Sequence, residues 1–229
     1  MSFSVLTIPF QVPPFGLSGR VYGALLNHRT AVEAVRSAAA KAPYNGLPKA
    51  PVLFIKPRNT LALSGDPVEV PTGEGELEMA AMLGVVIGAT ACRVAESRAL
   101  EHVAGYLIVN DVSVPHPDYY RPSVRYKARD GFCPLGPRVA TTREIGNPDT
   151  VAIRTYVDGA LVQTVSTSQL VRPTARLLAD VTEFMTLGPG DILALGAAAP
   201  APRARAGQTV AIEIDGIGLI ENRLVPERA

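Results

Sequence analysis

The chain has 229 residues, and its 22 lysines and arginines nearly balance its 21 aspartates and glutamates, for a formal net charge of +1. That balance argues against a nucleic-acid partner or binding to an anionic membrane surface. A hydrophobic content of 47% excludes a disordered chain. The length suits one large domain or two small ones.

Two cysteines, Cys92 and Cys133, are too few for a disulfide framework, and they form no Cys-x-x-Cys pair for zinc or redox chemistry. The N-terminal residues lack the basic and long apolar regions of a signal peptide. The longest apolar stretch, residues 79–92, is interrupted by glycines and is too short to cross a bilayer. We therefore expect a cytoplasmic protein with no membrane partner.

The first half of the chain predicts short strands with two helices between them. In chain order, strands are expected at residues 20–26, 52–55, 68–70, 82–87 and 106–109. A helix is expected over 31–41, with Thr30 as its N-cap, and an amphipathic helix over 95–104. Both helices are short, so strands dominate this half.

The second half predicts two hairpins and one more helix. Strands at 150–156 and 161–165 flank Asp158-Gly159, a strong hairpin signal. A helix over 172–185 has an apolar face made by Leu177, Leu178, Val181 and Phe184, and a strand at 192–195 follows it. The last strands, 210–214 and 219–224, flank Asp215-Gly216. The pattern favours a strand-rich α+β fold in a single domain, 1–229, with residues 1–18 as an N-terminal extension.

A basic cluster over residues 119–136 is the most informative segment. It contains four cations, three tyrosines and one carboxylate, although charged residues make up only 19% of the chain. It follows a buried apolar run that ends in Asn110-Asp111. An acid at the end of a buried strand, followed by clustered arginine and lysine, suits a site for a small, oxygen-rich anion. The alternative is a basic surface loop with ordinary ion pairs.

Six short sequence words occur in a family-specific order. They are Ala24-Leu25-Leu26-Asn27-His28-Arg29, Phe54-Ile55-Lys56-Pro57-Arg58-Asn59-Thr60, Asn110-Asp111-Val112-Ser113, Tyr119-Tyr120-Arg121-Pro122, the stretch 129–136 and the stretch 183–191. From about Val21 to Leu224 the chain resembles the fumarylacetoacetate hydrolase family. The resemblance implies a mixed β-roll or sandwich with a few short flanking helices. The Asn-His-Arg and Tyr-Tyr-Arg-Pro words favour the N-terminal type of half among the family's isomerase/decarboxylases.

The resemblance also implies a chemistry and partners. Family members hold Mg²⁺, Mn²⁺ or Ca²⁺ with a Glu-x-Glu pair and an aspartate, and hard oxygen ligands suit such ions. The ion stabilises an enolate during C–C cleavage, decarboxylation or keto–enol isomerisation. The implied activity is an isomerase/decarboxylase acting on a 2-hydroxy/2-oxo dienedioate in 4-hydroxyphenylacetate (homoprotocatechuate) catabolism. Implied partners are a small anionic dicarboxylate and a second subunit, in a homodimer or a heteromer with a homologue.

Only part of the implied catalytic apparatus is present. Asp111 matches the family's metal-binding aspartate, and Lys127 its catalytic lysine. The two glutamate positions align with Ala80 and Met82, which cannot ligate a hard cation. A Glu-x-Glu does occur at Glu76 and Glu78, four residues upstream, which is roughly 13 Å along an extended chain. These two glutamates remain candidate ligands if the segment bulges.

Other positions depart from the family pattern as well. Thr30 and Ala31 replace an Asp-His, and Gly196-Ala197-Ala198 replaces a Gly-Thr-Pro. Candidate substrate-binding residues are Tyr119, Arg121, Arg129, Asn27, His28 and Lys56.

Three hypotheses therefore remain open. The chain is an active metal-assisted isomerase/decarboxylase, or a metal-free and catalytically impaired partner subunit, or a dicarboxylate-binding module of the same fold. A divalent cation is expected only if the ligand set is complete, and otherwise no cofactor is expected.

Overall fold

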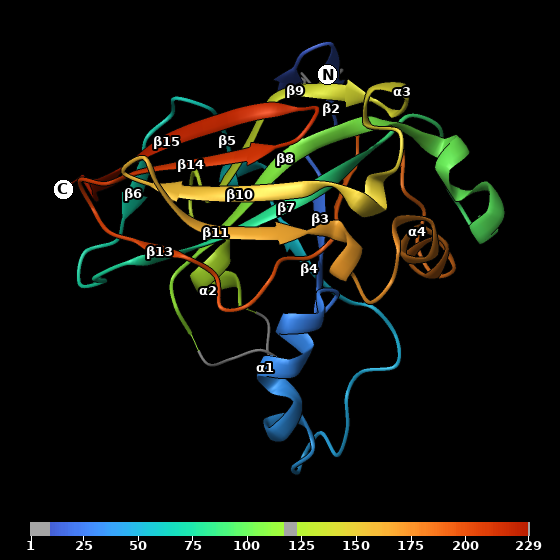
Figure 1. Cartoon of the computed structure of the whole chain (residues 1–229), viewed down its shortest axis with the longest axis horizontal. Coiled ribbons are helices and arrows are strands. Elements are labelled where there is room, and N and C mark those ends of the chain that lie inside the picture. The colour runs from blue at the N-terminus through green and yellow to red at the C-terminus, as the bar shows by residue number, and fades with distance from the viewer. Residues whose placement is uncertain (1–9, 117–122, 229) are drawn as a thin grey trace, which may run out of the picture.

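Two β-sheets form the body of the molecule, with most helices at their margins (Figure 1). The computed structural model describes residues 10–116 and 123–228. The larger sheet has the order β4 (Val52–Lys56), β3 (Val21–Leu25), β12 (Ile192–Ala194), β7 (Leu77–Ile87), β8 (Val103–Ser113), β9 (Cys133–Thr141) and β5 (Leu61–Leu63), and β13 (Arg203–Ala204) pairs with β7 off this path. The smaller sheet has the order β11 (Ala160–Ser166), β10 (Ala152–Val157), β14 (Thr209–Ile214), β15 (Gly218–Pro226) and β6 (Val68–Val70).

The remaining elements are short. A separate hairpin joins β1 (Phe10–Val12) to β2 (Phe15–Leu17), and the helices are α1 (Arg29–Ala39), α2 (Val124–Lys127), α3 (Thr142–Ile145) and α4 (Thr174–Thr182). The 3₁₀ turns within the described residues are η1 (Arg58–Thr60), η2 (Glu96–His102), η3 (Pro148–Thr150) and η4 (Thr167–Gln169). None of the described helices is long and apolar enough to cross a membrane. In Figure 1, α1 projects away from the sheets at the bottom of the view.

Strands β7 and β8 are the longest pair and carry apolar side chains on both faces. On one face of β7, Leu83, Val85 and Ile87 join a core that also contains residues of β10, β14 and α4. On the other face, Met82 and Val86 pack in a second core that includes the β1–β2 hairpin. A strand buried on both faces needs a nearly continuous apolar run, which is why this segment does not alternate.

The expected strand-rich α+β fold is confirmed, and most predicted strands lie within one or two residues of their expected bounds at one end or both. The predicted helix 31–41 begins earlier, and its N-cap is His28 rather than Thr30. The helix expected over 95–104 is the 3₁₀ turn η2, in which only Ala99 is buried, so no apolar face holds a regular α-helix there. Phe184 is exposed rather than part of the apolar face of α4, because α4 ends at Thr182.

Candidate active site

A cavity of about 310 Å³ lies where β7 and β8 approach α1, α2 and the segment before β13. Its lining is mostly apolar, with a few charged groups. The lining residues are Ala24, Leu25, Leu26, Ala31, Ala34, Glu78, Ala80, Met82, Asp111, Ser113, Lys127, Ala197, Ala198, Ala199, Pro200, Ala201 and Arg203. A few polar groups on an apolar wall are typical of a small-molecule site.

Asp111, near the end of β8, is held between two lysines. Its Oδ2 lies 2.6 Å from the Nζ of Lys127, and its Oδ1 lies 2.8 Å from the Nζ of Lys56. The carboxylate is only 2% exposed. Burial alone raises the pKa of Asp111, but the two ammonium groups outweigh it and hold that pKa below its ordinary value. The triad of two cations and one anion therefore carries a net positive charge.

Lys56 is a structural member of this triad. Its side chain is fully buried, and its Nζ donates to the carbonyl oxygens of Val112, Lys127 and Phe132 at 2.7, 2.7 and 2.8 Å. An ammonium has three protons, so these bonds use all of them. Burial lowers the pKa of Lys56, and the charge of Asp111 opposes that shift. Lys56 does not line the cavity, so its predicted contact with a substrate carboxylate is not available in this arrangement.

Lys127, at the end of α2, is the less deeply buried cation of the triad, with its side chain 11% exposed. It lines the cavity, and its Nζ donates to Asp111 and lies 5.0 Å from the centre of the Phe54 ring. Its other two N–H groups have no partner in the described part of the chain. A β-carbon on Gly23 would lie 2.1 Å from the Phe54 ring, so this glycine makes room for the ring beside Lys127. The predicted catalytic lysine thus faces the cavity with unused donors.

The residues around Asp111 do not fit a divalent cation. Ala80 lies directly opposite Asp111 in the β7–β8 pair, and Met82 follows on the same side. Neither side chain is a ligand for a hard ion. Both oxygens of Asp111 already contact ammonium groups. Among residues 10–116 and 123–228, no group of three His, Cys, Asp or Glu side chains is placed to hold a metal.

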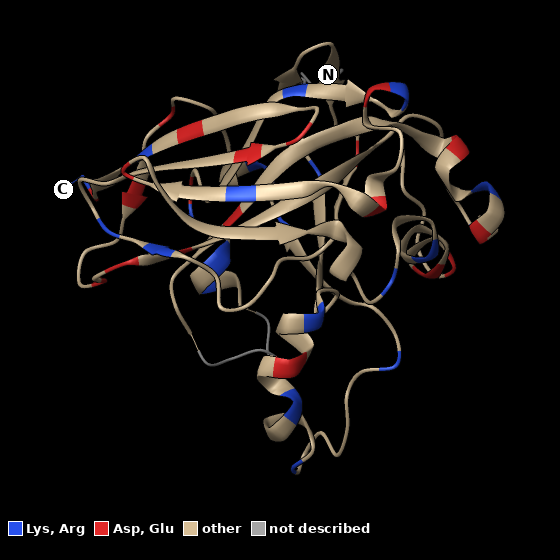
Figure 2. Cartoon of the chain, in the orientation of Figure 1, with Lys and Arg blue, Asp and Glu red and all other residues tan. Residues whose placement is uncertain are grey.

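The Glu-x-Glu pair is engaged elsewhere. Arg203 on β13 donates from one terminal nitrogen to Glu76 at 2.8 Å and from the other to Glu78 at 3.0 Å. Arg203 and Glu78 are directly paired across β13 and β7, and both line the cavity (Figure 2 marks the charges along these segments). Both glutamates predicted as metal ligands are therefore paired with Arg203. Glu78 lines the cavity, and Glu76 does not.

Helix α1 covers the cavity with small side chains, because Ala31 and Ala34 line it. The Nδ1 of His28 accepts the backbone N–H of Thr30 and caps the helix, while burial lowers the pKa of this histidine. The hydroxyl of Thr30 accepts the N–H of Ala199 at 2.9 Å, which ties α1 to the alanine-rich segment 197–201. His28, expected at the substrate, instead fixes the start of this helix.

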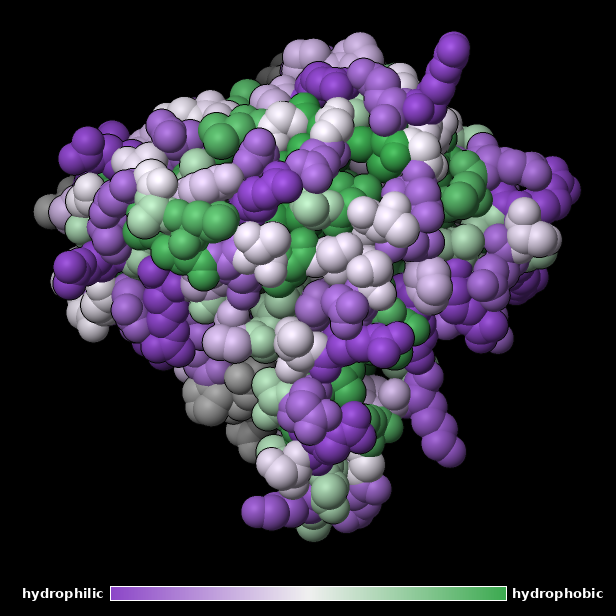
Figure 3. All heavy atoms as spheres, viewed as in Figure 1, coloured by the Kyte–Doolittle hydropathy of each residue, from purple (hydrophilic) through white to green (hydrophobic). Residues whose placement is uncertain are grey.

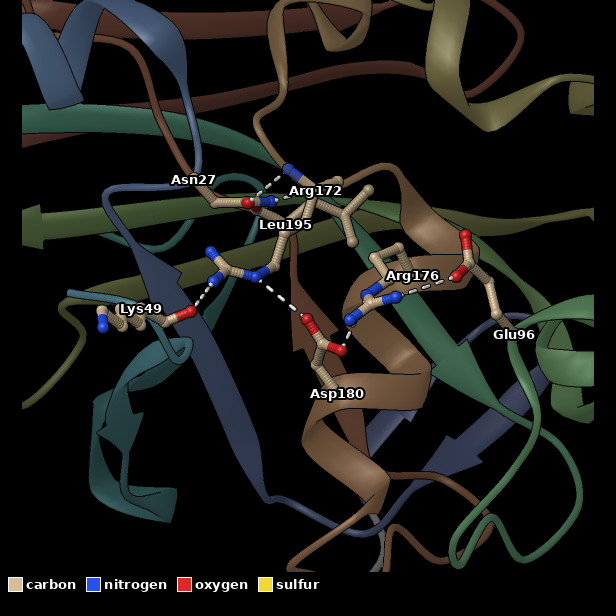
Figure 4. Close-up of polar contacts among 7 residues, drawn as sticks. All are labelled: Asn27, Lys49, Glu96, Arg172, Arg176, Asp180 and Leu195. Atoms are coloured by element: carbon tan, nitrogen blue, oxygen red, sulfur yellow. Dashed lines mark hydrogen bonds and ion pairs between the residues drawn. The ribbon is translucent and has the colours of Figure 1, made fainter. Parts of the chain in front are cut away.

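Asn27 anchors the same helix to the core (Figure 4). Its side-chain nitrogen donates to the carbonyl oxygens of Leu195 and Arg172, and its oxygen accepts the N–H of Arg172 at 2.9 Å. The Arg172 guanidinium donates to the carbonyl of Lys49 and to Asp180. Residues 27 and 49 stand before and after the α1 segment, so Arg172 holds both of its ends. Asn27, predicted to bind substrate, is buried in this structural network and does not line the cavity.

Arg129 is not among the described residues that line the cavity. Arg129 pairs with Glu227 at 3.6 Å and donates to the carbonyl of Arg125. Tyr119 and Arg121 lie outside the described residues. The sequence analysis missed Arg203 and Ser113. Arg203 follows an alanine- and proline-rich loop with no local motif, and only the non-local β13–β7 pairing reveals its place.

The chain matches both a protein family and individual known proteins. Residues 20–225 match the family described as fumarylacetoacetate (FAA) hydrolase C-terminal. Over 212 residues the chain is 39% identical to the 4-hydroxyphenylacetate degradation bifunctional isomerase/decarboxylase of Escherichia coli, a match that covers 93% of this chain and 48% of the relative. The chain therefore spans about half the length of the curated relatives that lead this comparison.

Solved structures share the fold. A 5-carboxymethyl-2-hydroxymuconate delta-isomerase from Mycobacterium smegmatis matches with a TM-score of 0.78 at 30% identity, covering 92% of this chain and 80% of that one. A fumarylpyruvate hydrolase from Pseudomonas aeruginosa, solved with Mn²⁺ and pyruvate, matches with a TM-score of 0.81 at 23% identity, covering 98% and 99%. A divalent ion thus occurs in a protein with this fold. On its sequence match and its fold, this chain belongs to the fumarylacetoacetate hydrolase family.

Proposed function

We propose that this chain is an isomerase/decarboxylase-type domain that acts on a 2-hydroxy/2-oxo dienedioate in aromatic catabolism. The observation that carries the proposal is Lys127, which presents two unused N–H donors to an otherwise mostly apolar cavity of about 310 Å³. The triad to which Lys127 belongs has two cationic side chains and one anionic one, which suits an anionic substrate. The names of the relatives with 39% and 30% identity support the same substrate class.

Lys127 supplies the electrostatic part of the reaction. Ketonisation of a 2-hydroxy diene acid removes the proton of the 2-hydroxyl group, and loss of CO2 from a carbon conjugated to a 2-oxo group leaves an enolate, so both reactions place negative charge on the C2 oxygen. A fixed ammonium that donates to this oxygen stabilises the charge as it develops, and such contacts are commonly worth several kcal/mol in a water-poor site. Asp111 accepts a hydrogen bond from Lys127 and keeps its ammonium in place. No step in this scheme uses a divalent ion.

The proposal is tested by ultraviolet absorbance of 2-hydroxyhepta-2,4-diene-1,7-dioate mixed with protein that has been stripped by a chelator. We expect the diene band to decay with the wild type and not with Lys127→Met. Arg129→Gln is the matched control, because it removes a nearby cation that does not line the cavity. Equal rates for Lys127→Met and the wild type would overturn the proposed role.

A binding module without chemistry is the second candidate. The substitutions at Ala80 and Met82, and Thr30 and Ala31 in place of the family's Asp-His, favour it. It predicts that the dienedioate binds, as detected by calorimetry, and that its absorbance does not change over hours. Turnover that depends on Lys127 would exclude this candidate.

A second domain of the same fold is the proposed partner, in a homodimer or a heteromer. Two observations support it. The leading curated relatives are about twice as long as the matched segment. The outer strand β11 also carries exposed Leu161 and Val162, and Figure 3 shows apolar residues gathered on this face of the molecule. Light scattering after size exclusion tests the homodimer, and a monomer would leave only the heteromer.

A further inference from the structure

The cavity is lined by a second cation besides Lys127, the guanidinium-bearing Arg203 on β13. We propose that Arg203 binds the distal carboxylate of a dioate whose 2-oxo or 2-hydroxy end lies at Lys127, and so selects dicarboxylates over monocarboxylates. This inference rests on the proposed function and adds the residue that sets its specificity.

The strand register gives the distance between the backbone of Arg203 and that of Asp111, the carboxylate that holds Lys127. Arg203 on β13 is paired with Glu78 on β7, and Glu78 with Ser113 on β8. Asp111, which holds Lys127, lies two residues away from Ser113 on β8. With strands about 4.8 Å apart and a rise of about 3.3 Å per residue, the backbone positions of Arg203 and Asp111 are roughly 12 Å apart.

A seven-carbon dioate has a suitable length for this gap. With single bonds of about 1.5 Å, its terminal carbons are roughly 7.5 Å apart when the chain is extended. The long side chains of Arg203 and Lys127 both line the cavity and can reach toward a ligand between their backbone positions. Most of the other lining side chains are apolar, among them Leu25, Met82 and the alanines of α1 and of segment 197–201. Hydrocarbon in the middle and a carboxylate at each end match this lining.

Arg203 also has donors to spare. Its guanidinium carries five N–H groups, and two of them reach Glu76 and Glu78. The other three have no partner in the parts of the chain that the structure describes. The side chain is 50% exposed, so a ligand can reach it. The planar guanidinium fits a carboxylate with two parallel hydrogen bonds, which a single ammonium cannot offer.

The two glutamates make the inference testable, because they compete with a substrate carboxylate for Arg203. Removing the Arg203 charge therefore weakens dioate binding, and removing a glutamate charge strengthens it. If Arg203 only joined β13 to β7, removing the charge of Arg203 or that of a glutamate would change dioate binding in the same direction. The sign of the change thus separates a substrate contact from a purely structural ion pair.

The experiment compares two substrates in chelator-treated buffer: 2-hydroxyhepta-2,4-diene-1,7-dioate and 2-hydroxypenta-2,4-dienoate, which lacks the distal carboxylate. For Arg203→Gln we expect KM for the dioate to rise by about 30-fold, within the range for a hydrogen bond to a charged group, with kcat changed by less than about 3-fold. KM for the monoacid stays within about 2-fold of the wild type. Glu76→Gln, outside the cavity lining, lowers KM for the dioate, and Arg203→Lys gives an intermediate value.

A non-reacting ligand separates failure of this inference from failure of the proposed function. Heptanedioate and hexanoate are titrated into each variant by calorimetry, whether or not turnover is seen. Loss of heptanedioate affinity in Arg203→Gln, with unchanged hexanoate binding, supports Arg203 as the carboxylate contact even for an inactive domain. Equal losses for both ligands, no loss for heptanedioate, or parallel effects of Arg203→Gln and Glu76→Gln overturn it. Thermal unfolding of each variant confirms that the fold is retained.

Discussion

Ala80 and Asp111 lie directly opposite each other on the central strands β7 and β8, so a methyl group faces the most buried carboxylate of the cavity. The charge of Asp111 is balanced by Lys56 and Lys127 at 2.8 and 2.6 Å instead. A related fold holds Mn²⁺ with pyruvate in the Pseudomonas aeruginosa hydrolase. With an alanine and a methionine beside it on β7, Asp111 has two ammonium groups as its partners and no further oxygen ligand from those two positions.

The first prediction concerns metal binding. Calorimetric titration of chelator-stripped protein with Mg²⁺ or Mn²⁺ is expected to give no binding up to millimolar ion, because Asp111 lacks partner ligands and faces two ammonium groups. Ala80→Glu with Met82→Glu adds two carboxylates on the same side of β7 and is expected to create measurable Mn²⁺ binding. Micromolar binding by the wild type that disappears in Asp111→Ala would contradict the prediction.

The second prediction concerns the stability supplied by the triad. Asp111→Asn removes the anion between two buried ammonium groups, and breaking such a pair costs about 3–5 kcal/mol. Urea denaturation at neutral pH measures the loss. Asp130→Asn is the control, because Asp130 is an exposed carboxylate that accepts a bond from Asn59, and its loss is expected to cost less than about 1 kcal/mol.

The difference in stability between the wild type and Asp111→Asn is predicted to depend on pH. The folded-state pKa of Asp111 lies below its unfolded value of about 3.9. Its contribution is therefore fully present above that unfolded value and is lost as pH falls through the lower, folded-state pKa. The stability gap between wild type and Asp111→Asn should be constant from pH 7 to about pH 5 and shrink below about pH 4. A gap that is unchanged in acid would show that Asp111 does not act through its charge.

The strands were predictable where burial alone sets the pattern. The run from Met82 to Ile87 is apolar because both faces of β7 are buried. Asp158-Gly159 marks the β10–β11 hairpin by local turn chemistry. Strand β9 was missed, because Pro134, Gly136 and Pro137 break its pattern and its pairing with β8 shifts register. Local signals failed where non-local pairing overrides them.

Some residues of the candidate site could be predicted from local motifs, and others depend on non-local pairing. Asp111 and Lys127 could be proposed from motif spacing, and the structure brings them together. Lys56 and Asn27 belong to motifs as well, but motif membership does not distinguish a buried structural contact from a substrate contact. Arg203 carries no motif, and its position depends on a two-residue strand paired across more than a hundred residues of chain.

The third prediction concerns the support of α1. Arg172→Met removes the link to Asp180 and to the Lys49 carbonyl, and hydrogen bonds to charged groups are worth about 1.5–3 kcal/mol (Figure 4). We expect that loss in urea denaturation, together with faster amide hydrogen exchange in α1. The substrate KM should rise more than kcat falls, since Ala31 and Ala34 of this helix line the cavity.

Arg176→Met is the control for this change. Arg176 also pairs with Asp180, but its side chain is 55% exposed and its other partner, Glu96, lies on η2 rather than near α1. A loss of less than about 1 kcal/mol and unchanged exchange in α1 are expected. If the two variants behaved alike, the network would stabilise α4 in general rather than hold the α1 segment.

The fourth prediction concerns the ring beside Lys127. A β-carbon on Gly23 would lie 2.1 Å from the Phe54 ring, so Gly23→Ala must displace that ring or strand β3. Overpacking of this kind costs about 1–3 kcal/mol. Because the ring lies under the Lys127 ammonium, we expect lower turnover as well as a lower melting temperature. Gly75→Ala is the matched control, since nothing lies within 4 Å of its added methyl group. Wild-type turnover in a destabilised Gly23→Ala protein would mean that the Phe54 ring does not position Lys127.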